Sequence, residues 1–207
     1  MTSEAYLDWA LAASDPVLAR LEREAAADDI PIVTRQVAAL ISLLAKLIRP
    51  ELIVELGTAT GYSGIWLLRA WPGARLISFE LDESRAASAR RNLAEAGVGD
   101  RADVRTTNAI EGLEGLSPGS ADLVFNDVLN GLRSVHRVEH CFRLARDVLK
   151  PGGLLLADNA LEARRLSGYE TLQARCVHRW NELVRVDRSL TATILPIGDG
   201  LSVAVRS

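Results

Sequence analysis

The sequence predicts an α/β protein built on a Rossmann-like sheet of seven mostly parallel strands, with helices on both faces and an antiparallel last strand. Two observations predict this fold. From residue 51 onward, short apolar runs alternate with amphipathic stretches, as they do in the βαβ units of a parallel sheet. Between the last two apolar runs, Asp199 and Gly200 have the composition of a tight hairpin turn, so the sheet should end with an antiparallel pair.

The 207 residues, of which 48% are hydrophobic, suffice for one substantial core and fit one domain. We expect accessory helices over residues 1–48 and a Rossmann-like core over residues 51–207. The expected strands are residues 52–56, 75–80, 103–107, 121–127, 154–158, 190–195 and 201–205. The expected core helices lie near residues 61–71, 83–96, 109–115, 134–149 and 163–186.

The chain before the first strand carries helical patterns. Residues 4–27 have helical character, and Pro16 follows Asp15 as the first residue of a second helix would follow its cap. Thr34 precedes a run of apolar residues at helical spacing that stops before Pro50. This run should form a helix that packs on the sheet.

Charge and composition exclude several classes of protein. Lys and Arg number 24 against 27 Asp and Glu, and no dense basic run occurs, which argues against nucleic acid as a partner. The N-terminus lacks a signal-peptide pattern, and no uninterrupted apolar stretch approaches the ~18 residues of a membrane span. We therefore expect a cytoplasmic protein without a membrane partner. Cys141 and Cys176 should be reduced, partly buried thiols.

A glycine-containing turn follows the first predicted strand and runs Val54-Glu55-Leu56-Gly57-Thr58-Ala59-Thr60-Gly61. Gly57 and Gly61 lack a Cβ, so a ligand can approach the backbone closely, and open α/β sheets bind small-molecule cofactors at such turns. The spacing is GxxxG rather than the GxGxxG of dinucleotide sites. Because the charge of Glu55 would repel a pyrophosphate, we expect a zwitterionic or cationic ligand.

Polar residues also follow the second and third predicted strands. Glu80 lies where a carboxylate could accept hydrogen bonds from both hydroxyls of a ribose, although acidic residues also favour the start of a helix. Asn108 and Ala109 could lie beside an adenine, although Asn108 could equally be a helix N-cap. These positions agree with a nucleoside-containing cofactor.

Three oxygen-bearing side chains follow the fourth and fifth predicted strands. Asp127, Asp158 and Asn159 offer two carboxylates and one amide oxygen, which are hard ligands suited to Mg²⁺ or a similar cation. Each residue taken singly could instead cap the loop that follows it. Carboxylates that converge at one edge of a sheet repel one another unless a cation joins them, and this favours a metal site.

The glycine-containing turn resembles motif I of the class I S-adenosylmethionine-dependent methyltransferases. Residues 30–207 resemble one branch of that class, the small cation-dependent O-methyltransferases related to catechol and caffeoyl-CoA O-methyltransferases. Besides the turn, the resemblance rests on Asp122-Leu123-Val124-Phe125-Asn126-Asp127, Pro151-Gly152-Gly153-Leu154-Leu155-Leu156-Ala157-Asp158-Asn159 and Leu195-Pro196-Ile197-Gly198-Asp199-Gly200-Leu201.

The resemblance implies a set of site residues. Asp127, Asp158 and Asn159 would bind the divalent cation. The residues that would contact S-adenosylmethionine are Val33, Thr34, Glu55, Gly57, Thr58, Gly61, Ser63, Glu80, Asn108, Ala109 and Asp127. The resemblance also implies a homodimer and a small hydroxylated acceptor.

The chain departs from the family pattern after Asp127. Asn130 stands where the family has a lysine that is the candidate general base, and an amide cannot accept a proton at neutral pH. His136 and His140 lie one helical turn apart, and we expect surface or packing roles for them rather than a metal site. His136 is a candidate base if its loop folds over the site, because imidazole titrates near neutral pH.

The leading hypothesis is an S-adenosylmethionine-dependent O-methyltransferase, assisted by a divalent cation, that acts on a catechol-like acceptor with an altered base. Asn130 motivates one alternative, a metal-independent or N-directed small-molecule methyltransferase. A second alternative is a non-catalytic protein that binds S-adenosylmethionine. Metal dependence of methyl transfer to a catechol would separate the leading hypothesis from the metal-independent alternative. Cofactor binding without turnover would favour the non-catalytic protein.

Overall fold

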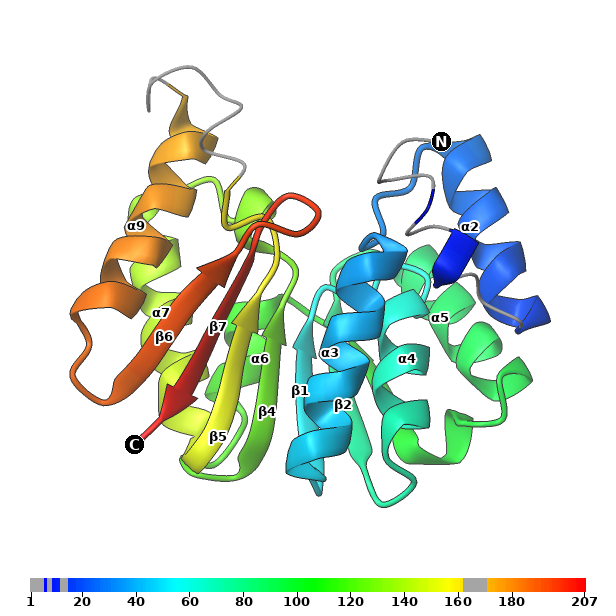
Figure 1. Ribbon diagram of the computed structural model, residues 1–207, viewed down its shortest axis with the longest axis horizontal. Coiled ribbons are helices and arrows are strands. Elements are labelled where there is room, and N and C mark those ends of the chain that lie inside the picture. The colour runs from blue at the N-terminus through cyan, green and yellow to red at the C-terminus, as the bar shows by residue number, and fades with distance from the viewer. Residues whose placement is uncertain (1–5, 7–8, 12–14, 162–170) are drawn as a thin grey trace.

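Seven strands form one mixed sheet in the order β3-β2-β1-β4-β5-β7-β6 in the computed structural model, which describes residues 6, 9–11, 15–161 and 171–207 (Figure 1). From β3 to β5 all neighbouring strands are parallel, whereas β7 is antiparallel to both β5 and β6. The predicted fold class is therefore confirmed. The strands are β1 Leu52–Leu56, β2 Arg75–Glu80, β3 Ala102–Thr106, β4 Ala121–Asn126, β5 Leu149–Ala157, β6 Leu190–Leu195 and β7 Leu201–Arg206.

Helices cover both faces of the sheet, and most begin at a polar cap. The side chains of Asp15, Thr34 and Ser134 accept hydrogen bonds from backbone N–H groups in the first turns of α2, α3 and α7. The helices are α2 Pro16–Asp28, α3 Arg35–Ile48, α4 Tyr62–Ala70, α5 Glu83–Glu95, α6 Ala109–Glu114, α7 Val135–Val148 and α9 Leu172–Val186. Two short 3₁₀ helices are η1 Gly99–Arg101 and η2 Leu129–Gly131.

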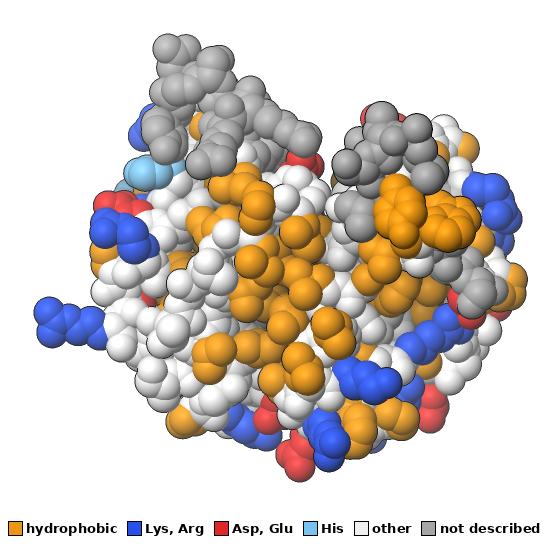
Figure 2. Space-filling view, viewed as in Figure 1, with side chains coloured by type: hydrophobic (Ala, Val, Ile, Leu, Met, Phe, Trp, Pro, Cys, Tyr) orange, Lys and Arg blue, Asp and Glu red, His pale blue; other side chains and the backbone are white. Residues whose placement is uncertain are grey.

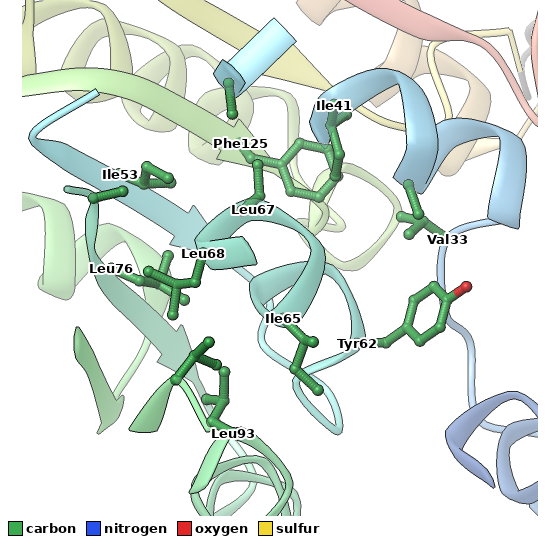
Figure 3. Close-up of a cluster of buried hydrophobic side chains, with 14 of the residues drawn as sticks. Val33, Ile41, Ile53, Tyr62, Ile65, Leu67, Leu68, Leu76, Leu93 and Phe125 are labelled. Carbon is green, nitrogen blue, oxygen red and sulfur yellow. The ribbon is translucent and has the colours of Figure 1, made fainter. Parts of the chain in front are cut away.

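Two hydrophobic clusters hold the layers together, one on each face of the sheet. Because successive strand residues point to opposite faces, Ile53 belongs to the cluster that includes residues of α2, α3, α4 and α5, whereas its neighbour Val54 belongs to the cluster that includes residues of α6, α7 and α9. Figure 3 shows side chains of α3, α4 and the sheet meeting in the first cluster, with Phe125 of β4 among them. In the second cluster, Phe142 meets Trp180 edge to face with ring centroids 5.5 Å apart.

Two elements begin several residues away from the sequence prediction, whereas the other strand and helix ends agree within about one residue. β5 begins at Leu149 rather than at residue 154, because Leu149 pairs with Ala121 before the register shifts, and the Pro-Gly-Gly sequence that follows suggested a turn. α9 begins at Leu172, where Thr171 caps it, and residues 163–170 of the predicted helix lie outside the described part of the chain. Within the described ranges, no helix combines the length and apolarity that a membrane span requires.

The topology creates a crevice at the carboxyl end of the sheet. The chain goes from β1 outward to β2 and β3, then returns to the other side of β1 and continues with β4 and β5. The strand order therefore reverses between β1 and β4, and ligands of open α/β sheets bind at such a point. All the loops that carry predicted site residues after β1, β2, β4 and β5 leave the sheet at this edge.

Candidate active site

A cavity of about 580 Å³ lies at this edge of the sheet and brings most of the predicted site residues together. The predicted residues that line it are Thr34, Gly57, Glu80, Asn108, Ala109, Asp127, Asn130, Asp158 and Asn159. A separate groove of about 440 Å³ between α9 and β6 contains none of them. The first cavity is therefore the candidate active site.

Gly57 allows the turn after β1 to approach the turn after β4. Its φ is +93°, and a Cβ added there would lie 2.8 Å from a methyl carbon of Val128 and 3.1 Å from the carbonyl oxygen of Asp127. The Gly57 N–H donates to the carbonyl oxygen of Phe79 at 3.0 Å. A side chain at this position would push the cofactor turn away from the predicted metal ligand.

Glu55 lies beneath the turn, fully buried, and does not line the cavity. Its carboxylate accepts hydrogen bonds from the hydroxyls of Ser63 at 2.6 Å and Ser78 at 2.5 Å. The hydroxyl of Thr58 lies 2.5 Å from that of Ser78 and extends this buried chain. Burial raises the pKa of Glu55 to about 7, the two serine hydroxyls oppose the rise, and the charge of Glu80 adds to it.

The raised pKa of Glu55 predicts a pH dependence of stability. Between about pH 4.5 and pH 7 the unfolded chain loses the Glu55 proton while the folded protein keeps it, so the free energy of unfolding should fall as pH rises. Glu55→Gln mimics the neutral acid and should lack this decline. The wild type should lose roughly 3 kcal/mol relative to the variant across this interval. Urea unfolding of both proteins without cofactor, from pH 4.5 to pH 8, measures the difference.

Comparing Glu55→Gln with the wild type cancels the titration of groups that do not interact with Glu55; the charges of Asp127 and Glu80 do interact with it. Near pH 4.5 the two proteins should have similar stability, since both carry a neutral side chain that the serine hydroxyls can bind. Parallel stability curves over the whole pH interval would show that Glu55 is already ionised in the folded protein at low pH and would contradict the prediction.

Glu80 lines the cavity and is only 6% exposed. One carboxylate oxygen accepts from the backbone N–H of Ala59 at 2.9 Å, and the other accepts from the N–H of Asp82 at 3.0 Å and from the guanidinium of Arg85 at 2.8 Å. Glu80 thus ties the turn after β1 to the start of α5. Among the described residues, Oε1 accepts from both Asp82 and Arg85, whereas Oε2 accepts only from Ala59 and keeps a second lone pair, so a hydrogen bond from a ribose hydroxyl would fall on Oε2.

Asn108 and Thr34 each combine a capping role with a place on the cavity wall. The side chain of Asn108 accepts from the N–H of Ile110 at the start of α6, and Ala109 lines the cavity beside it. The capping role of Asn108 is therefore compatible with its predicted place beside the adenine. Thr34 caps α3 and lines the cavity, whereas Val33 is buried in the core.

Three more predicted cofactor contacts lie behind the cavity wall rather than on it. Thr58 and Ser63 are buried in the hydroxyl chain around Glu55. Gly61, with φ +89°, forms the N-terminal boundary of α4. These residues shape the turn, and a direct contact with the cofactor stays a prediction for each of them.

Asp127 and Asp158 meet at the cavity as two like charges. The cavity leaves part of Asp127 exposed, but the surrounding protein, together with Asp158 and Glu55, raises its pKa well above the usual range. Asn159 lines the same cavity and has φ +64°, a left-handed conformation that asparagine tolerates well.

The predicted metal ligands fit a hard divalent cation. Two carboxylates whose charges repel, with an amide beside them, form a donor set that such a cation would neutralise and bind. Histidine and cysteine, which softer metals favour, do not line this cavity. In the described ranges, including this cavity, His, Cys, Asp and Glu form no cluster of three or more that could hold a metal, so the predicted donor set depends on the amide of Asn159 beside the two carboxylates.

Asn130 lies in η2 and lines the cavity with Asp127 and Asp158. Its Oδ1 atom is buried, and no other residue in the described part of the chain donates a hydrogen bond to it. His136 lies outside the cavity: its side chain is 97% exposed, and its Nδ1 atom lies 3.7 Å from a carboxylate oxygen of Glu139. The structure therefore does not bring the predicted alternative base to the site.

Several cavity residues were not predicted as site residues. Arg85 was detectable in principle, because it lies within α5 shortly after Glu80 and could be expected to pair with that carboxylate. Arg137 and Leu132 carry no such signal, since their place on the wall depends on how the loop after β4 folds. Asp199 lies at the predicted hairpin, but the sequence does not indicate that this turn reaches the cavity.

The fold and the site together define a class I S-adenosylmethionine-dependent methyltransferase: the strand order reverses at β1, and the turn after β1 meets acidic residues that follow the neighbouring strands. A model of the O-methyltransferase family matches residues 10–207. The chain belongs to this family, in the branch related to catechol and caffeoyl-CoA O-methyltransferases.

Individual relatives agree with this assignment. The catechol O-methyltransferase of Mycobacterium tuberculosis is 34% identical over 186 residues, which are 84% of this chain and 83% of the relative. The O-methyltransferase TomG from Streptomyces achromogenes, solved in complex with S-adenosylmethionine, has a TM-score of 0.83 and 29% identity, with 98% of this chain and 95% of TomG covered. An O-methyltransferase from Bacillus cereus in complex with S-adenosylhomocysteine has a TM-score of 0.82 and 26% identity, with coverage of 98% and 96%.

Proposed function

We propose that this methyltransferase transfers a methyl group from S-adenosylmethionine to one hydroxyl of a small, catechol-like acceptor with the help of a divalent cation. The observation that carries the proposal is the convergence of Asp127, Asp158 and Asn159 on the cavity that Gly57 and Glu80 also line. The name of the Mycobacterium tuberculosis relative supports a catechol as the acceptor. A catechol has two adjacent oxygens, which suit binding to one cation.

The two halves of the cavity would take different parts of the reaction. On the side of β2, Glu80 would accept hydrogen bonds from the ribose, and Asn108 and Ala109 would border the adenine. On the side of β4 and β5 the acceptor would meet the sulfonium. Because methyl transfer is an in-line displacement, the principal task of the protein is to align the attacking oxygen with the methyl group.

Asp127, Asp158 and Asn159 would hold the cation through their oxygen atoms. When bound, a divalent cation supplies a Lewis acid that orients adjacent oxygens and lowers the pKa of a hydroxyl. The two carboxylates would then no longer repel each other, and the ionised state of Asp127 would be favoured.

Asn130 would orient the acceptor rather than deprotonate it. We propose that Asn130 occupies the position of the family's lysine, because it lies beside Asp127 and Asp158 on the cavity wall. An amide side chain on the cavity wall can exchange a hydrogen bond with an acceptor hydroxyl but cannot take the proton at neutral pH. A catechol whose hydroxyl is acidified by the cation would not require a protein base at this position.

Methyl transfer to a panel of catechols, with Mg²⁺ and with a chelator, tests the proposal. We expect turnover that falls at least about 100-fold in the chelator, because the loss of charge stabilisation by a metal costs several kcal/mol. Restoring Mg²⁺ should restore the rate, which controls for inactivation by the chelator. Equal rates with and without metal would contradict the proposal and favour the metal-independent alternative that Asn130 motivates.

We also propose that the protein forms a homodimer through an apolar surface on the face of the sheet that carries α3. Figure 2 shows hydrophobic side chains gathered over α3 and the adjacent part of β5 and β7. On these elements, Leu43 and Leu47 of α3 and Val205 of β7 are 55%, 70% and 40% exposed. A contiguous apolar surface of this kind is typical of protein interfaces. Sedimentation equilibrium would distinguish the dimer from a monomer.

A further inference from the structure

Among the residues that the structure describes, Arg85 and Arg137 line the candidate active site, and they differ in their partners. Arg85 donates to Glu80 through Nε at 3.1 Å and through Nη2 at 2.8 Å. Arg137 is exposed, and its guanidinium forms no hydrogen bond or ion pair with any residue in the described part of the chain. Arg137 is thus the cavity's cation whose charge is not already matched by a described carboxylate.

Arg137 belongs to the acceptor half of the cavity. It lies in the first turn of α7, which follows β4, and the loops after β4 and β5 also carry Asp127, Asn130 and Asp158. Arg85 follows β2 and stands with the residues that would bind the nucleoside. Since β1 separates β2 from β4 in the sheet, the two arginines border different parts of the bound ligands.

The charges of the acceptor half favour an anionic substituent once the predicted cation is bound. Asp127 and Asp158 would then be neutralised by that cation, which leaves the positive charge of Arg137 and the negative charge of Asp199, an aspartate with an interaction of its own, on this part of the wall. A guanidinium binds carboxylates through two parallel hydrogen bonds, with more geometric specificity than an ammonium group provides. Leu132, which also lines the cavity, offers an apolar surface for a ring.

We infer that Arg137 binds an anionic group on the acceptor, so that the preferred acceptor is an aromatic carboxylate with two adjacent hydroxyls rather than a neutral or cationic catechol. The inference rests on the proposed O-methylation of catechols and adds the class of substituent to it. Arg137 acts here as a specificity residue: it contacts the substituent and takes no part in the proton or methyl transfer.

A comparison of three acceptors with the same ring tests this inference: 3,4-dihydroxybenzoate, catechol and 3,4-dihydroxyphenethylamine. The wild type should have the highest kcat/KM for the carboxylate. Arg137→Gln should lower kcat/KM for the carboxylate by about 10- to 100-fold, mainly through KM, because a charge-assisted bidentate pair is lost. Its kcat/KM for neutral catechol should change less than about threefold.

Arg143→Gln is the matched control, because Arg143 is an exposed arginine of the same helix that does not line the cavity. It should behave as the wild type with all three acceptors. An equal decrease for every acceptor in Arg137→Gln, or a preference of the wild type for the amine, would overturn the inference.

A binding measurement separates failure of this inference from failure of the proposed reaction. Calorimetry would measure the affinity of 3,4-dihydroxybenzoate for the protein with S-adenosylhomocysteine and Mg²⁺. If no catechol is methylated, the proposed reaction fails, and binding still decides the role of Arg137. Affinity that falls at least about tenfold in Arg137→Gln supports the inference, whereas unchanged affinity, or no binding by the wild type, overturns it.

Discussion

Glu80→Gln should weaken the binding of S-adenosylmethionine by about 100-fold. The carboxylate of Glu80 lines the cavity and already accepts hydrogen bonds from Ala59, Asp82 and Arg85, and Oε2, which among the described residues accepts only from Ala59, keeps a lone pair for the cofactor. A glutamine has only one acceptor oxygen. Its NH₂ group would face either the protein donors or the ribose, and neither arrangement lets the side chain accept all the hydrogen bonds that the carboxylate accepts. Hydrogen bonds to charged groups contribute about 1.5 to 3 kcal/mol each, which gives this magnitude. Calorimetry with S-adenosylmethionine and S-adenosylhomocysteine measures the change.

Glu83→Gln is the control for the loss of one negative charge near the start of α5. Its side chain is 68% exposed and pairs with Arg90 away from the cavity, so the affinity for S-adenosylmethionine should change less than about twofold.

An S-adenosylhomocysteine analogue without the ribose 2′-hydroxyl shows whether Glu80 binds the ribose directly or only supports the fold of the site. It should bind more weakly than the parent ligand to the wild type but about equally to Glu80→Gln. If the analogue loses the same factor of affinity with the wild type and with Glu80→Gln, Glu80 has a purely structural role.

The parallel core of this fold could be predicted from local sequence patterns. The predicted ranges of β1, β2 and β6 match the structure, because each is a short apolar or alternating run bounded by polar or turn residues. β5 could not be delimited, since its first residues pair through a register shift that the Pro-Gly-Gly sequence conceals. Pairing across strands is a tertiary property, and local pattern carries little information about it.

The candidate site likewise contains residues that could be predicted from the sequence and residues that could not. Residues that end strands, such as Glu80 and Asp127, were predictable because the carboxyl ends of parallel strands meet at one edge. Arg137 was not, because its reach into the cavity depends on the path of the chain through η2 and into α7. His136 is the opposite case: its chemistry suited a base on the condition that its loop folds over the site, but the first turn of α7 directs it to solvent, as expected of a surface histidine.

Asp127→Asn should abolish the response to metal and lower methyl transfer by about 1,000-fold. Removing one of two carboxylate ligands weakens the binding of a hard cation, and the Lewis acid contributes several kcal/mol to the transition state. Turnover of a catechol at saturating S-adenosylmethionine and a titration with Mg²⁺ measure the two effects. Cofactor affinity should fall far less than turnover, since Glu80 and the turn after β1 are unchanged.

The thermal stability of Asp127→Asn without metal provides an independent test, because we expect the substitution to raise stability although it lowers activity. In the wild type, the charges of Asp158 and Glu55 act against ionised Asp127, so the neutral amide should raise the thermal midpoint by roughly 2 to 4 °C in the presence of a chelator. Mg²⁺ should then raise the midpoint of the wild type but not that of the variant. Asp103→Asn, at an exposed aspartate paired with Arg105 in β3, should leave both midpoints and turnover as in the wild type. A variant that loses activity, loses stability without metal and still responds to Mg²⁺ would show that Asp127 supports the fold and is not a ligand.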